Sequence, residues 1–102
     1  MSKKVLAIDF DGVIHDFKNP LKGRRMGAPL PGAKEALIAY KQRGDTIIIH
    51  SVWGDKPKAI SDFMDYYGLP FDTITNIKPN ADVYLDDKAI RFINWTETFN
   101  LL

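Results

Sequence analysis

Hydrophobic residues along the chain form short unbroken runs that are separated by segments of helical periodicity. Residues 5–8 and 46–49 are apolar or β-branched throughout, as expected for strands buried on both faces of a parallel sheet. Shorter runs within 71–77 and 82–85 predict a third and a fourth strand. Residues 90–93 alternate weakly, which predicts a fifth strand or, as an alternative, a helix.

Two segments between these runs repeat apolar residues at intervals of three and four, so each forms one apolar helical face. The first helix is expected to follow Pro31-Gly32 and to end at Gly44. The second is expected to have Asp55 as its N-cap and to end at Gly68. The two apolar faces consist of Ala33, Ala36, Leu37 and Tyr40, and of Ile60, Phe63, Met64 and Tyr67.

A last short helix, capped by Thr96, is expected to carry Phe99 and Leu102, and residues 15–31 read as a loop or hairpin. Strands that alternate with helices predict parallel pairing through right-handed crossovers. We therefore expect one domain over residues 1–102, a three-layer α/β/α Rossmann-like domain with a parallel sheet of about five strands. Ligands bind such sheets at the carboxyl ends of the strands.

The amino-acid composition excludes several kinds of functional site. The chain has no cysteine, which excludes disulfides, thiolate zinc sites and cysteine nucleophiles. Its net charge of +1 predicts no strong affinity for nucleic acid. The first apolar run is too short, and too close to acidic residues, for a signal peptide or membrane span. We therefore expect a cytoplasmic protein without a membrane partner, and a homo-oligomer is compatible with the sequence.

Polar residues occur where the predicted strands end, namely Asp9 and Asp11, Ser51, Lys78, and Asp86 and Asp87. Because the carboxyl ends of parallel strands meet at one edge, these side chains are expected to converge. Clustered carboxylates repel one another and imply a bound cation. Oxygen ligands alone suit Mg²⁺, and a hydroxyl and a lysine beside it describe a phosphate site.

The turn after the first strand supplies two further parts of such a site. Backbone N–H groups of Phe10 and Gly12 are expected to point at phosphate oxygens. One carboxylate of the pair Asp9/Asp11 can attack phosphorus while the other protonates the leaving group. This pattern predicts hydrolysis of a phosphate monoester, carried by a small molecule or by the end of a macromolecule.

These residues also resemble the motifs of a known family. Asp9-Phe10-Asp11-Gly12-Val13 after a buried strand resembles the first motif of the haloacid dehalogenase superfamily. Ser51 resembles its second motif, Lys78-Pro79 its third, and Tyr84-Leu85-Asp86-Asp87 its fourth. The four motifs occur in the family's order and approximate spacing over nearly the whole chain.

The resemblance implies a role for each residue. Asp9 would be the nucleophile and a Mg²⁺ ligand, and Asp11 the general acid/base with its backbone carbonyl on the metal. Ser51 and Lys78 would hold the phosphoryl group, Asp86 would ligate Mg²⁺, and Asp87 would help directly or through water. Dehalogenases of the superfamily lack the second aspartate of the first motif, so Asp11 favours phosphoryl transfer. The chain has no room for the cap domain that usually selects substrate.

Candidate substrate contacts lie in two segments near these motifs. Arg24 and Arg25 belong to a basic stretch that could grip a second anionic group, and Trp53 and Lys56 follow Ser51. His15 and His50 are interpreted as structural.

Two other classes of protein share these features. A receiver-type signalling module also combines acids, a hydroxyl and a lysine on a parallel sheet, but its acidic pair comes first along the chain. In this chain the pair Asp86/Asp87 follows Lys78, which weighs against a receiver. A non-catalytic phosphate-binding protein is the second alternative, although no motif residue is missing.

Overall fold

A computed structural model describes residues 3–16, 18–22, 26–52 and 57–102 of the chain. Within these residues the chain forms four strands and three helices. Their order is β1 (Val5–Asp9), α1 (Ala33–Gln42), β2 (Thr46–His50), α2 (Pro57–Tyr67), β3 (Thr73–Thr75), β4 (Val83–Leu85) and α3 (Trp95–Leu101). None of the helices in the described part is long and apolar enough to cross a membrane.

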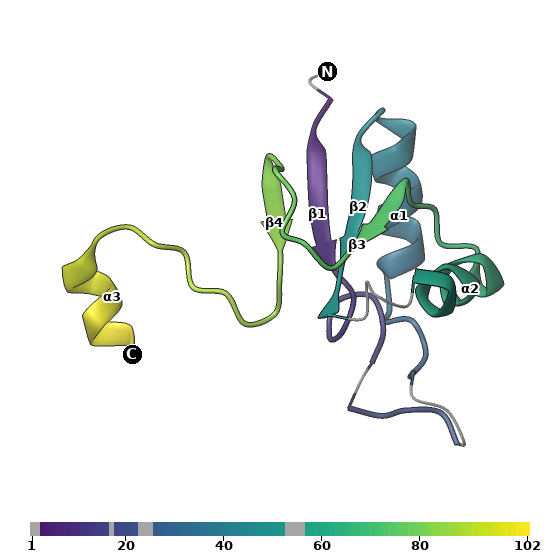
Figure 1. The fold of residues 1–102 in the computed structure, drawn as a ribbon, viewed down its shortest axis with the longest axis horizontal. Helices are drawn as coiled ribbons and strands as arrows, with labels where there is room; N and C mark the ends of the chain where they lie inside the picture. Colours follow the sequence, from purple (N-terminus) through teal and green to yellow (C-terminus); the bar gives the residue numbers. More distant parts are fainter. Residues whose placement is uncertain (1–2, 17, 23–25, 53–56) are drawn as a thin grey trace.

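The strands form one sheet in the order β3-β2-β1-β4, and every neighbouring pair is parallel (Figure 1). The register places Ile8 of β1 between Ile49 of β2 and Leu85 of β4. The expected α/β class with a parallel sheet is confirmed, and this architecture is consistent with a Rossmann-like fold. The third strand is shorter than the run within 71–77 that predicted it.

Helices α1 and α2 cover the same face of the sheet, because β1, β2 and β3 follow one another in one direction through right-handed crossovers. Their predicted apolar faces point inward: Leu37 of α1 and Ile60, Phe63 and Met64 of α2 are buried. With alternate residues of the strands they form one core, which consists of Leu6, Ile8, Phe10, Ile14, Leu37, Ile47, Ile49, Ile60, Phe63, Met64 and Leu69.

The second helical layer that the sequence predicts is not formed by the described residues. The link from β3 to β4 passes in front of β1 in Figure 1, whereas α1 lies behind β2. Helix α3 stands apart from the sheet at the far end of an extended segment (Figure 1), and none of its residues is buried. We call residues 88–102 the C-terminal arm. The predicted cap of α3 was wrong, because Asn94 rather than Thr96 accepts the Glu97 N–H, at 2.9 Å.

The predicted fifth strand at 90–93 is also not formed. A parallel strand beside β4 needs a crossover of a dozen or more residues. Only residues 86–89 separate β4 from 90–93. Residues 90–93 therefore have no parallel partner strand within reach in their own chain.

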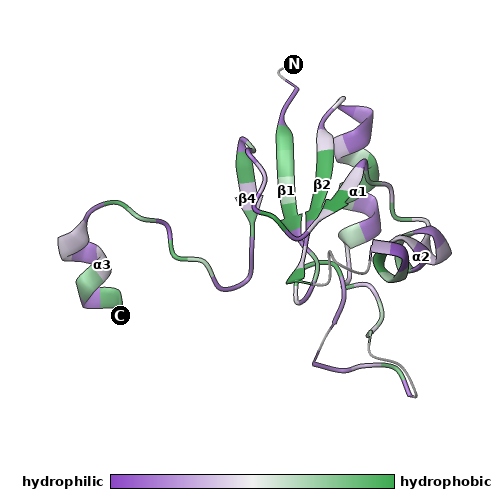
Figure 2. Cartoon of the chain, in the orientation of Figure 1, coloured by the Kyte–Doolittle hydropathy of each residue, from purple (hydrophilic) through white to green (hydrophobic). Residues whose placement is uncertain are grey.

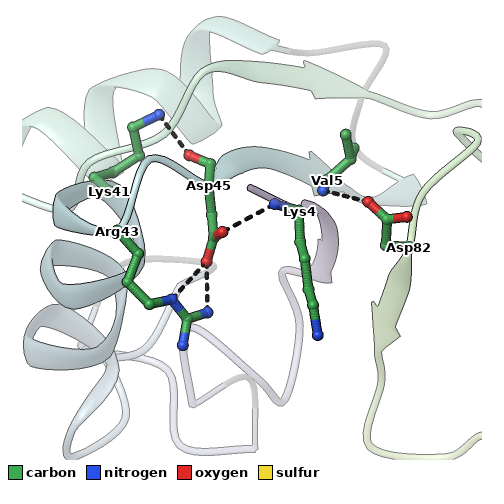
Figure 3. Close-up of polar contacts among 6 residues, drawn as sticks. All are labelled: Lys4, Val5, Lys41, Arg43, Asp45 and Asp82. Carbon is green, nitrogen blue, oxygen red and sulfur yellow. Dashed lines mark hydrogen bonds and ion pairs between the residues drawn. The ribbon is translucent and has the colours of Figure 1, made fainter. Parts of the chain in front are cut away.

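Two acids, the buried Asp45 and the exposed Asp82, fix the strands at the amino end of the sheet (Figure 3). The carboxylate of Asp45, 1% exposed, accepts the Lys4 N–H at 3.0 Å and two hydrogen bonds from Arg43. The Arg43 guanidinium, followed by the Lys4 N–H, lowers the pKa of Asp45 below its usual range. Asp82 accepts the Val5 N–H at 2.7 Å and so holds β4 beside β1. These carboxylates are structural, and they leave the opposite edge of the sheet for the candidate site.

Candidate functional site

Three carboxylates meet at the carboxyl ends of the two adjacent strands β1 and β4. Asp9 is the last residue of β1, and Asp86 and Asp87 directly follow β4. Because Ile8 pairs with Leu85, Asp9 and Asp86 continue the same register by one residue. One oxygen of each of the three carboxylates lies within 4.8 Å of the others. Asp9 is half-buried, whereas Asp86 and Asp87 are exposed.

The surroundings of Asp9 make its negative charge costly. Burial, and then the charge of Asp86, raise the pKa of Asp9 above its ordinary value. The Phe10 N–H, which donates to Asp9 Oδ1 at 3.1 Å, opposes this rise. A divalent cation among the three carboxylates would relieve the repulsion, and a donor set of oxygens alone fits a hard ion such as Mg²⁺. Asp11, the fourth predicted ligand, does not contribute a carboxylate to this group.

Asp11 is instead held by a buried histidine. His15 Nε2 lies 2.5 Å from Asp11 Oδ1, and the Gly27 N–H donates to His15 Nδ1 at 3.2 Å. Because Nδ1 accepts this hydrogen bond, the ring proton lies on Nε2 and points at Asp11. His15 is fully buried, and its ring packs against the rings of Phe10 and Phe63. The histidine therefore fixes the position of the Asp11 side chain.

A hairpin-like loop keeps His15 in place. The chain returns on itself so that the Asp16 N–H donates to Ala28 O at 3.0 Å and the Leu30 N–H to Ile14 O at 2.8 Å. The expected loop or hairpin at 15–31 is present in its described part. A Cβ on Gly27 would lie 1.9 Å from Asp16 O, so only glycine allows the two sides to approach this closely.

The turn after β1 uses its backbone donors within the protein. Gly12 has a φ of 79°, which suits glycine, and its N–H donates to His15 O at 3.0 Å. The Phe10 N–H donates to Asp9, and the Phe10 side chain is part of the core. The expectation that Phe10 and Gly12 offer free N–H groups to phosphate is therefore not met in this structure.

Ser51 and Lys78, the two residues predicted to hold the phosphoryl group, occupy different surroundings. Ser51 follows β2, is buried, and its N–H donates to Thr75 O at 3.0 Å. Asp9 and His50 share a register, so Ser51 lies at the same edge of the sheet as Asp9. Lys78 lies in the link between β3 and β4, with its Nζ 4.8 Å from the centre of the Tyr84 ring.

The strand pairing sets the face on which Lys78 lies. Tyr84 pairs with Ala7, and side chains two residues apart on a strand share a face. The Tyr84 ring therefore lies on the same face as Ala7 and Asp9, and the ammonium group of Lys78 lies over that ring. The Tyr84 hydroxyl donates to Pro79 O at 2.6 Å and accepts the Ala81 N–H at 3.1 Å. These two hydrogen bonds fix the link between β3 and β4 to strand β4.

The four candidate substrate contacts, Arg24, Arg25, Trp53 and Lys56, lie outside the described residues. Sequence reasoning missed the contact between His15 and Asp11, because His15 was interpreted as structural. The spacing of four residues across a glycine turn is the only signal that pointed to it. His50, also interpreted as structural, is half-buried at the end of β2.

Comparison with solved structures identifies two similar folds. A conserved protein from Bacteroides thetaiotaomicron matches with a TM-score of 0.68 and 23% identity, covering 98% of this chain and 89% of the other. A crystal structure of a structural-genomics target from Vibrio cholerae matches with a TM-score of 0.53 and 25% identity, covering 96% of this chain and 95% of the other. No family model and no curated protein matches the chain. The first likeness supports the α/β fold described above.

Proposed function

We propose that this chain is a Mg²⁺-dependent phosphatase that resembles a capless member of the haloacid dehalogenase superfamily. It hydrolyses phosphate monoesters through an aspartyl-phosphate on Asp9, with Asp11 as the general acid/base. The observation that carries the proposal is the meeting of Asp9, Asp86 and Asp87 beside Asp11, whose carboxylate is oriented separately. Carboxylates in two distinct environments suit two distinct tasks. Asp9 binds the metal and attacks phosphorus, and Asp11 transfers the proton.

The first half of the reaction forms the intermediate. A carboxylate oxygen of Asp9 attacks phosphorus, and the bond from phosphorus to the leaving oxygen breaks. Asp11 gives its proton to that oxygen, so the product leaves as an alcohol. His15 engages Oδ1 of Asp11, and Oδ2 is therefore the oxygen that carries the transferred proton. Mg²⁺, held by Asp9, Asp86, Asp87 and the Asp11 carbonyl, would neutralise charge on the phosphoryl oxygens.

The second half of the reaction restores the enzyme. Asp11, now a carboxylate, takes a proton from water while the water oxygen attacks phosphorus. The bond between phosphorus and Asp9 breaks, and inorganic phosphate leaves. Ser51 and Lys78 are assigned to the phosphoryl oxygens as a neutral donor and a point charge. Lys78 is supported in this role by its position on the face of the sheet that carries Asp9.

Phosphate release from a generic aryl phosphate, with Mg²⁺ or with a chelator, tests the proposal. We expect turnover only with Mg²⁺, and we expect Asp9→Asn to remove it, because the amide is a poor nucleophile and carries no charge. Asp65→Asn is the matched control, since Asp65 is an exposed acid of α2 outside the cluster. Calorimetric titration with Mg²⁺ should show weaker binding to Asp86→Asn than to Asp65→Asn.

Other outcomes distinguish the alternatives. Turnover in chelator, or more than a few percent of activity in Asp9→Asn, would contradict the covalent mechanism. A phosphorylated chain that is stable for hours would favour a receiver-type module. Binding of Mg²⁺ and phosphate without turnover of any ester would favour a non-catalytic phosphate-binding protein. A screen of metabolites and oligonucleotide ends would then identify the substrate.

A further inference from the structure

The C-terminal arm exposes an unusual amount of apolar surface for its length. Figure 2 shows apolar stretches along the extended segment and along α3. Seven large apolar residues of the arm are each between 47% and 87% exposed, namely Ile90, Phe92, Ile93, Trp95, Phe99, Leu101 and Leu102. Exposed apolar residues in such density mark a binding surface. Helix α3 has 7 residues, and isolated helices shorter than about 12 residues are marginal in water. The arm therefore needs a surface to pack on.

A matching surface is present on β4. This strand is an edge of the sheet, and among the described residues no strand pairs with its outer side. Val83, Tyr84 and Leu85 are each between 41% and 46% exposed. Val83 and Leu85 pair with Leu6 and Ile8 and so extend the apolar face beyond the helices that cover it. An open edge with apolar side chains accepts an added strand.

The arm does not reach this surface as a parallel strand of its own chain. Residues 86–89 are too few for a parallel crossover, as described above. The Lys88 N–H donates to Asp86 Oδ1 at 2.7 Å, which fixes a turn directly after β4. From this turn the chain runs away from the sheet (Figure 1). The arm of a second copy is not limited by that link.

The exposed area is large enough for a stable dimer. A compact protein of 11.6 kDa has an accessible surface of roughly 5,800 Å², whereas this chain exposes 7168 Å². The excess, roughly 1,300 Å² per copy, is more than the roughly 800 Å² that each partner buries in a standard interface. The radius of gyration, 14.7 Å, also exceeds the roughly 13 Å of a compact domain of this length.

We propose that residues 88–102 dock on the outer edge and exposed side chains of β4 of a second copy, and that two copies exchange these arms reciprocally. Each copy carries both the arm and its receptor, so one two-fold axis satisfies both and closes the assembly. Residues 90–93 then supply in trans the fifth strand that their sequence predicts. The arm starts directly after Asp86 and Asp87, so the exchange also places the two candidate sites at the interface. The inference is independent of the proposed phosphatase activity.

Sedimentation equilibrium of the full chain over micromolar to millimolar concentration tests the exchange. We expect a closed dimer of twice 11.6 kDa. Trp95→Glu should raise its dissociation constant at least about tenfold, because aromatic anchors dominate interfaces. Tyr66→Glu is the matched control, since Tyr66 and Trp95 are both 76% exposed but Tyr66 lies on α2. Circular dichroism melting of both variants separates dissociation from unfolding.

Two further measurements test the receptor strand β4 and the docked arm separately. Val83→Glu, in the receptor, should weaken the dimer as Trp95→Glu does. Amide hydrogen exchange should show protection of 90–93 and of β4 that increases with protein concentration. Asp9→Asn should dimerise like the wild type, so loss of activity and loss of exchange are distinguishable.

Several results would overturn the proposal. A chain that stays monomeric at millimolar concentration with a freely exchanging arm would point to a different partner. A monomer whose arm is protected would show folding back within one chain. A dimer unaffected by Trp95→Glu, or growth beyond the dimer without limit, would rule out a closed exchange.

Discussion

Replacing His15 with leucine tests whether the hydrogen bond to Asp11 serves proton transfer. Leucine keeps a buried apolar side chain but removes both ring nitrogens, so Asp11 Oδ1 loses its donor and the Gly27 N–H its acceptor. A hydrogen bond to a charged group contributes about 1.5–3 kcal/mol. If the whole of this is lost in the transition state, the rate falls by roughly 10- to 150-fold.

The size of the loss should depend on the leaving group. An alkyl phosphate needs a proton on its leaving oxygen, and general acid catalysis contributes roughly 10²–10⁴-fold there. A nitrophenolate leaves without receiving a proton. We therefore expect kcat/KM of His15→Leu to fall by roughly 10- to 150-fold on an alkyl phosphate and to change little on p-nitrophenyl phosphate. His15→Gln, which keeps a donor, should recover part of the loss.

Two measurements separate this effect from simple destabilisation. Urea unfolding should show a cost of about 1–3 kcal/mol, because the Gly27 N–H is left unpaired. Phe63→Leu is the matched control, since Phe63 packs against His15 with ring centres 5.8 Å apart but is not part of its hydrogen bonds. Equal losses on both substrates, or the same substrate dependence in Phe63→Leu, would refute the positioning role.

Three other predictions follow from the described contacts. Gly27→Ala should lower the melting temperature and the activity together, because its Cβ would lie 1.9 Å from Asp16 O; unchanged melting would contradict the close approach. Replacing Mg²⁺ with Ca²⁺ should inhibit turnover, because Ca²⁺ takes more ligands at longer bonds; equal rates with both ions would argue against a rigid metal site. Burial acts to raise the pKa of Asp72, but hydrogen bonds from Lys41 and the Ile47 N–H outweigh it and lower this pKa. Its stabilisation is therefore present above about pH 4 and is lost as the pH falls through the lowered value. Asp72→Asn should be less stable than the wild type at pH 7 in urea unfolding and should lose less stability on acidification, and identical pH profiles would show that Asp72 contributes nothing.

Local patterns in the sequence predicted the elements that depend mainly on their own residues. The apolar faces of α1 and α2 follow from spacing alone, and Leu37 and Met64 are buried as expected. Runs of β-branched residues likewise predicted β1 and β2. The positions of Asp9 and Asp86 at one sheet edge followed from parallel topology, because strand ends meet there whatever the intervening sequence.

Features that depend on contacts between distant parts of the chain were not predicted. Residues 90–93 have a strand-like pattern, but a parallel neighbour needs a longer link than residues 86–89 provide, and periodicity does not measure the length of the link. The Gly12 N–H was predicted to be free. Its acceptor, His15 O, comes within hydrogen-bonding distance only through the geometry of the turn, which the local sequence does not indicate. Lys78 lies over the Tyr84 ring because the link bends back onto β4, which no local pattern indicates.

The pairing of β1 with β4 joins nearly opposite ends of the sequence, and this determines when the acidic cluster can exist during synthesis. Asp82 bonds to Val5 across a separation of 77 residues. At about 5–20 residues per second, a ribosome needs roughly 4–15 s to make that interval. During this time Asp9 is present without Asp86 and Asp87, and one edge of β1 is unpaired. The nascent chain therefore lacks the complete acidic cluster, and the strand that completes the cluster is also the one that covers the open edge of β1.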